Sequence, residues 1–214
     1  MSRDATHTFL AYSRHEHARF DYEPDPERLA HLLGIRIISG RTNEATHGPP
    51  SIIQLARDLH VGRRRFTLLH EINHVLMQRI GLEEAVAAEV DEDDSDAHIE
   101  AVVNHAAGQM ILPDPLVNIV HGMYGDTPEA VLNLALAGKA SVPASMHRFI
   151  GRDPEAYLGA FMTSGSYIAH VATCNIGLPF HRYERVPEVH LVLPQARLLT
   201  VPRRLDVQLG VVGW

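Results

Sequence analysis

The segment Phe66 to Ile80 constrains the fold of this chain more than any other part of its sequence. Its apolar residues recur at intervals of three and four, which predicts a long helix with one face buried in a core. These apolar positions are Leu68, Leu69, Ile72, Val75, Leu76 and Met77. Gly81 follows as a natural helix end. The same segment reads His70-Glu71-Ile72-Asn73-His74, so two histidines four residues apart fall on one face of the predicted helix.

Two imidazoles on adjacent helical turns can bind one metal ion, and the HExxH pattern adds a carboxylate beside them. Glu71 lies about 100° round the helix from His70. That position is near enough to act on a water beside the metal without replacing it. We therefore expect His70 and His74 to be metal ligands and Glu71 to be the general acid and base of a hydrolytic reaction.

A catalytic metal site of this type needs a third protein ligand. The metzincin continuation fails, because Met77 and Ile80 stand where its glycine and third histidine would be. An acidic ligand on a following helix is the alternative, and Glu100, in a helix expected at residues 97–112, is the best candidate. The competing candidates are Glu83, Glu84, Glu89, His98 and His105. Asn104, one turn after Glu100, is expected to orient a ligand imidazole, and His105 is a second polar group near the ligands.

Two histidines and one glutamate predict Zn²⁺ as the metal, with Mn²⁺ as the alternative, because such sites bind several divalent ions.

The remaining sequence predicts a mixed α+β fold. Three segments carry a capping oxygen, a proline and an acid, which are typical of a helix start. They are Asp25-Pro26-Glu27, Thr127-Pro128-Glu129 and Asp153-Pro154-Glu155. Short helices are expected at 128–137 and 142–150, and the acidic run 89–96 is expected to be an exposed loop. Strands are expected at 35–38, 51–55, 167–173, 189–193, 197–201 and 205–212, with a loop at 41–50.

These patterns divide the chain into three expected parts. Residues 1–125 would form a domain with the HExxH helix and a small β-sheet. Residues 126–152 would form a short helical segment, and residues 153–214 a strand-rich piece.

Composition and charge argue against several classes of protein. The formal net charge of −7 argues against nucleic acid as a direct partner. Charges or prolines interrupt every apolar run before the roughly 18–20 residues of a membrane helix, so no membrane partner is expected. Cys174 is the only cysteine, which excludes an internal disulfide, and the N-terminus has no apolar core of signal-peptide type. The expected location is therefore the reducing cytoplasm.

The segment RRRFTLLHEINHVL (Arg63 to Leu76) resembles the lead-in and metal-binding helix of the ImmA/IrrE metallopeptidases. The resemblance continues in Glu100-Ala101-Val102-Val103-Asn104 and in Met110-Ile111-Leu112-Pro113, with a spacing closest to the radiation-response IrrE/PprI branch. It covers about residues 25–190. It implies a zincin-like core of the gluzincin type, with His70, His74 and Glu100 as ligands and Glu71 as acid and base. It also implies a helix-turn-helix-like segment at 126–152 and a partial sensor-like domain after it.

Peptidases of that family cleave a helix-turn-helix transcriptional repressor and so switch on stress, DNA-damage or mobile-element genes. The resemblance therefore implies a site-specific endopeptidase with a protein substrate. We expect the substrate to bind as an extended strand along a sheet edge, at Ser51 to Leu55. The alternative is a DNA-binding or scaffold regulator with a non-catalytic metal site, in which the segment 128–150 and the basic residues around it would contact DNA. Those basic residues are Lys139, His147, Arg148 and Arg152.

Overall fold

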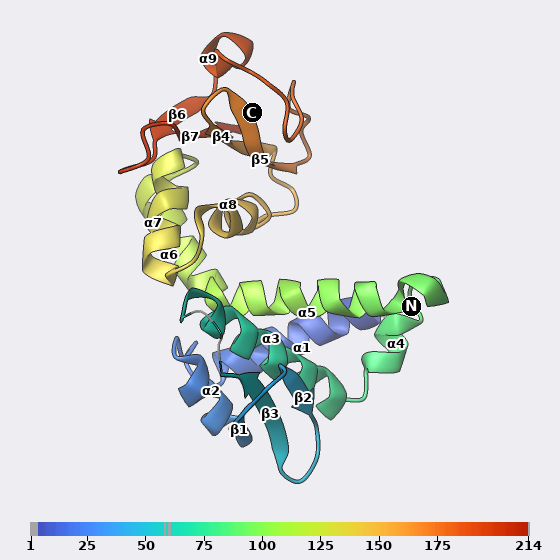
Figure 1. The fold of residues 1–214 in the computed structure, drawn as a ribbon. Helices are drawn as coiled ribbons and strands as arrows, with labels where there is room; N and C mark the ends of the chain where they lie inside the picture. Colours follow the sequence, from blue (N-terminus) through green and yellow to red (C-terminus); the bar gives the residue numbers. More distant parts are fainter. Residues whose placement is uncertain (1–3, 58, 60, 214) are drawn as a thin grey trace. The chain divides into compact units, whose positions relative to one another are not determined.

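A computed structural model describes residues 4–57, 59 and 61–213 (Figure 1). The protein is mixed α+β and divides into two compact units, Met1–Ile111 and Leu112–Trp214. The α+β class predicted from the sequence is confirmed. Among the described residues, no helix has both the length and the apolarity that crossing a bilayer requires.

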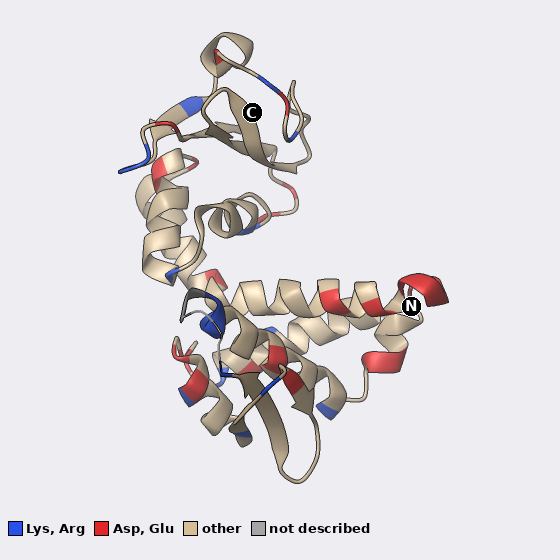
Figure 2. Cartoon of the chain, in the orientation of Figure 1, with Lys and Arg blue, Asp and Glu red and all other residues tan. Residues whose placement is uncertain are grey.

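The first unit packs helices against a small three-stranded sheet (Figure 1). Its helices are α1 (Ala5–Ala18), α2 (Pro26–Leu32), α3 (Val61–Arg79), α4 (Glu83–Ala87), the 3₁₀ turn η1 (Glu92–Asp94) and α5 (Ser95–Ile111). Its strands are β1 (Ile35–Gly40), β2 (Glu44–Thr46) and β3 (Ser51–Ala56). The acidic run between α4 and α5 is exposed from Asp91 to Asp94, as expected, although it forms a 3₁₀ turn (Figure 2).

The expectation that Ser51 to Leu55 forms a sheet edge is wrong. The strand order is β1-β3-β2, so β3 is central, parallel to β1 and antiparallel to β2. Ser51, Ile53 and Leu55 are accordingly buried. The outer strand β2 lies inside the segment expected to be loop. Its three residues are too few to display a strand periodicity in the sequence.

Helix α3 lies at the centre of the first unit's core. The apolar face of this helix is buried, as the periodicity of its sequence predicted. The polar Asn73 is also fully buried: its Oδ1 accepts from Ser13 Oγ (2.6 Å) and its Nδ2 donates to Leu69 O (2.8 Å). Ser13 belongs to α1, a helix that the apolar pattern did not predict, because Ser13, Glu16 and His17 are among the residues on its buried face.

The second unit contains helices followed by a four-stranded antiparallel sheet. The helices are α6 (Asp114–Tyr124), α7 (Pro128–Gly138), α8 (Val142–Ile150) and α9 (Val189–Val192). The strands are β4 (Leu158–Ser164), β5 (Tyr167–Cys174), β6 (Arg197–Thr200) and β7 (Gln208–Gly213), in the order β5-β4-β7-β6. Helix α8 packs against α7, β4 and β5.

Two sequence expectations in this unit are wrong. Residues 189–193 are not a strand, because Val189–Val192 forms the short helix α9. Asp153 does not start a helix: its Oδ1 accepts from Glu155 N (3.0 Å) in a turn that leads into β4. A proline after a capping residue suits a turn as well as a helix start, so this signal alone does not separate the two.

The boundary between the two structural units lies after Ile111, whereas the sequence predicted boundaries after residues 125 and 152. The prolines that end α5 also begin α6, with Pro113 as its N-cap, and α6 belongs to the second unit. Helices α6, α7 and α8 therefore share one compact unit with the C-terminal sheet. The three functional parts, 1–125, 126–152 and 153–214, stay predictions.

Candidate metal centre

Three side chains from α3 and α5 converge in the first unit. His70 Nε2 lies 3.0 Å from His74 Nε2, because residues four apart on α3 share a face. The Glu100 carboxylate, on α5, lies 3.4 Å from His70 Nε2 and 3.2 Å from His74 Nε2. The ligand atoms of these three side chains all lie within 4.8 Å of one another, so the group could hold a metal ion. Within the described part of the chain, it is the one group of His, Cys, Asp and Glu side chains that could do so.

The hydrogen bonding of His70 and the pKa of His74 suit metal binding. His70 Nδ1 lies 3.1 Å from Asn104 Oδ1. Since an amide oxygen can only accept, Nδ1 carries the hydrogen and the Nε2 lone pair faces the group. Burial, and then the neighbouring His70, lower the pKa of His74, which favours the neutral imidazole that a metal requires. The donor set therefore fits a divalent cation such as Zn²⁺.

Glu71 is buried beside this group, with 6% of its surface exposed. Burial, followed by the charges of Glu100 and Glu44, raises the pKa of Glu71 to about 7. A bound cation would act in the opposite direction. A carboxylate that exchanges its proton near neutral pH is suited to general acid and base chemistry.

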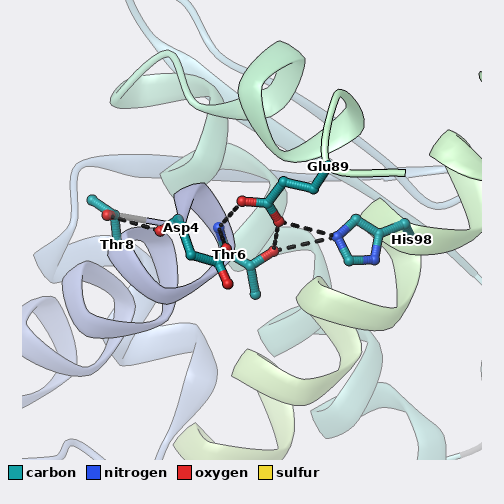
Figure 3. Close-up of polar contacts among 5 residues, drawn as sticks. All are labelled: Asp4, Thr6, Thr8, Glu89 and His98. Carbon is teal, nitrogen blue, oxygen red and sulfur yellow. Dashed lines mark hydrogen bonds and ion pairs between the residues drawn. The ribbon is translucent and has the colours of Figure 1, made fainter. Parts of the chain in front are cut away.

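Two of the competing third-ligand candidates are engaged elsewhere in the same unit (Figure 3). Glu89 Oε1 accepts from Thr6 N (3.0 Å), and its Oε2 accepts from Thr6 Oγ1 (2.6 Å). His98 Nε2 lies 3.3 Å from the same Oε2. The pair therefore fastens the start of α1 to the α4–α5 segment.

The other candidates also lie outside the converging group, as far as the chain is described. Glu83, at the start of α4, is near enough for its charge to raise the pKa of His74, and Glu84 is exposed on the same helix. His105 Nε2 lies 3.0 Å from Gln109 Nε2, one turn further along α5. Whether Asn104 and His105 act in support of the ligands stays a prediction.

Two residues near the site were not singled out by the sequence. Glu44 lies on β2, where a loop was expected, and acts on Glu71 through its charge. Phe66 was taken as the first residue of a buried helix, yet the residue is 38% exposed, and its ring lies 6.3 Å from that of His70, centroid to centroid. The basic-aromatic run before the HExxH pattern was the available signal for Phe66. No signal pointed to Glu44.

Comparison with known proteins gives a family and a fold. Residues 29–142, more than half of the chain, match the peptidase family model described as "IrrE N-terminal-like domain". No curated protein matches the sequence. A solved structure described as a Mycobacterium tuberculosis transcriptional regulator is similar, with a TM-score of 0.58 and 13% identity, over 96% of this chain and 75% of that one. At that identity the likeness concerns the fold.

Proposed function

The chain belongs to the metallopeptidase family of the IrrE N-terminal-like domain, and we propose that it is a metal-dependent endopeptidase that cleaves a helix-turn-helix transcriptional repressor. The IrrE/PprI branch within the family stays a prediction. So does the gluzincin type of core, in which the third ligand comes from a later helix.

One observation carries the proposal. His70, His74 and Glu100 converge from two helices with Glu71 buried beside them, which supports a metal site with a general base next to it. A purely structural metal site has no need of a fourth, non-ligating carboxylate, whereas a hydrolytic site does.

The roles of the chain's own residues follow from their positions. A divalent metal held by His70, His74 and Glu100 would polarise a peptide carbonyl and lower the pKa of a bound water. Glu71 accepts the proton of the attacking water and passes it to the leaving amine. Asn104 holds the His70 ring in the orientation that turns His70 Nε2 toward the metal position.

The substrate is proposed from the family. A repressor segment in extended form would pair with the outer edge of β2, which within the described residues pairs with β3 alone. The loop after β2 is tied to the metal-binding helix, because His47 N donates to Gln78 Oε1 (3.0 Å). A strand bound at this edge would therefore lie beside α3, against which β2 packs.

The first test is a cleavage assay. The protein, loaded with Zn²⁺ or Mn²⁺, is incubated with each helix-turn-helix repressor encoded by its own genome, and the products are identified by mass spectrometry. We expect one discrete cut, and a loss of rate of about 10²–10⁴-fold in Glu71→Gln. That variant should keep one metal per chain, and Glu84→Gln, an exposed acid on α4, should cleave normally. Cleavage by Glu71→Gln at the normal rate would contradict the proposed mechanism.

The second candidate is a DNA-binding or scaffold regulator whose metal site is not catalytic. The name of the similar solved structure, a transcriptional regulator, favours it. Two of the basic residues that would contact DNA are engaged within the second unit, where Arg148 pairs with Asp114 and Arg152 with Asp126. Sequence-selective binding to DNA fragments of the same genome, with no cleavage of any repressor, would support this candidate over the endopeptidase.

A further inference from the structure

Among the side chains of helix α3 that the structure describes, one large apolar side chain, that of Phe66, is in contact with solvent. Its large apolar residues between Leu68 and Met77 are at most 2% exposed, whereas Phe66 is 38% exposed. The exposed ring is not at a frayed helix end, because Phe66 lies more than one turn inside α3, which begins at Val61. A rigid, half-exposed aromatic ring retains apolar area that a ligand can cover.

This ring lies directly beside the metal centre. Phe66 precedes His70 by four residues and therefore stands on the same face of α3, one turn earlier. The two rings are 6.3 Å apart between centroids and inclined at 37°. This face of the helix thus carries Phe66, His70 and His74 in succession, and Phe66 is the exposed one of the three.

Polar contacts tie the first turns of α3, which carry Phe66, to a neighbouring segment. Arg64 donates from Nε and a terminal nitrogen to Glu27 Oε1, at 3.2 and 3.0 Å. Arg65 donates to Pro24 O at 3.3 Å. Both contacts fasten the helix to the segment that starts α2. The turn of the helix that carries the ring is therefore tethered before a ligand binds.

The distance identifies which substrate side chain would reach this ring. Consecutive Cα atoms of a bound peptide are about 3.8 Å apart, and successive side chains point to opposite sides. If the carbonyl of the cleaved bond lies beside His70 and His74, the Phe66 ring is about one helical turn away. A substrate side chain that covers this ring then belongs to a residue that flanks the cleaved bond.

We propose that Phe66 forms an apolar subsite for the substrate side chain next to the cleaved bond, so that cleavage sites carry a residue such as Leu, Met or Phe on one side. The inference rests on the proposed endopeptidase function. It adds a residue that selects the site of cleavage.

The test compares two hydroxamate-capped peptides that differ only in one side chain, Phe against Ala, beside the metal-binding group. Binding to the zinc-loaded protein is measured by calorimetry. We expect the Phe peptide to bind about tenfold more tightly, a difference of about 1.4 kcal/mol. Phe66→Ala should bring this ratio close to one, and Phe66→Leu should keep most of it, since Leu is also apolar. Leu32→Ala, at an exposed apolar residue (41%) of the same unit, should leave the ratio unchanged.

A ratio that is the same in the unaltered protein and in Phe66→Ala overturns the inference, whatever the protein cleaves. The cleavage arm is separate: a library of peptides from a digested proteome is incubated with each variant, and the residues that flank the cuts are read by mass spectrometry. An apolar preference lost in Phe66→Ala supports the inference. Failure of the unaltered protein to cut any peptide or repressor would sink the proposed function, while the binding ratio would still decide whether Phe66 forms the subsite.

Discussion

The ring orientation of His70 depends on one contact. His70 Nδ1 donates to Asn104 Oδ1, with 3.1 Å between the two atoms. This leaves His70 Nε2 to face His74 and Glu100. Without this acceptor the ring could rotate about its bond to Cβ, or the hydrogen could move to the nitrogen that binds metal. We therefore expect the loss of this contact to lower metal affinity without removing a ligand.

We expect Asn104→Ala to weaken zinc binding about 10–100-fold, the usual effect of losing a partner of a ligand imidazole. Asn104→Asp, which keeps an acceptor oxygen, should retain most of the zinc affinity of the unaltered protein. Competition with a chromogenic chelator measures both. Asn118→Ala, at an exposed asparagine on α6, is the control and should bind zinc normally. Unchanged affinity in Asn104→Ala would show that this hydrogen bond does not orient the ring.

At the scale of elements, α1 is attached at its start by a polar contact (Figure 3). The Glu89 carboxylate meets Thr6 in the first turn of the helix, where the helix dipole favours a negative charge. Burial would raise the pKa of Glu89, but the hydrogen bonds of the Thr6 side chain, Asp4, the Thr6 backbone and His98 outweigh it and lower the pKa to about 2.

This pKa predicts a stability that depends on pH. A carboxylate whose folded-state pKa lies below its ordinary value of 4.5 stabilises the fold fully above that value. As the pH falls from 4.5 toward 2, Glu89 is protonated in the unfolded chain before it is protonated in the folded one. The contribution of its carboxylate to stability is therefore lost over this range. Glu89→Gln lacks the ionised group, so we expect it to be less stable than the unaltered protein at pH 6 and the difference to shrink toward pH 2.

Urea unfolding at several pH values between 2 and 6 measures this difference. Glu92→Gln, an exposed acid of the neighbouring 3₁₀ turn, serves as the control and should change stability little at any of them. A gap between the unaltered protein and Glu89→Gln that stays constant over the whole range would argue against the role assigned to Glu89.

Elements with a strong local pattern were predicted, and those without one were missed. The helix that carries His70 and His74 was predicted because its apolar residues repeat at the helical period. Helix α1 was missed because its buried face includes the polar residues Ser13, Glu16 and His17, of which Ser13 bonds to the distant Asn73. Strand β2 was missed because three residues paired with β3 show no periodicity of their own.

At the scale of the whole molecule, the first unit holds every residue of the candidate metal centre and its own apolar core. We therefore expect a fragment of residues 1–111 to fold and to bind one zinc ion with an affinity close to that of the full chain. Circular dichroism and chelator competition are the measurements. A fragment that stays unfolded with zinc present would mean that the core depends on residues beyond 111.

The family match extends past this unit, from residue 29 to 142, and so includes α6 and α7. A folded fragment makes it possible to ask whether those helices are needed for cleavage. If the fragment binds zinc but does not cut a repressor that the full chain cuts, residues beyond 111 contribute to cleavage and the metal centre does not need them.

The sequence by itself determined the metal-binding face of one helix, since the positions of His70, Glu71 and His74 on a helix follow from local geometry alone. It ranked Glu100 first among several candidates for the third ligand but could not exclude the others by geometry, because that depends on how α5 packs against α3. Tertiary structure brought Glu100 to the two histidines and drew Glu89 and His98 toward α1. It also made β3 central and left Phe66 exposed. Contacts between segments distant in the chain decide all of these, and no local pattern encodes them.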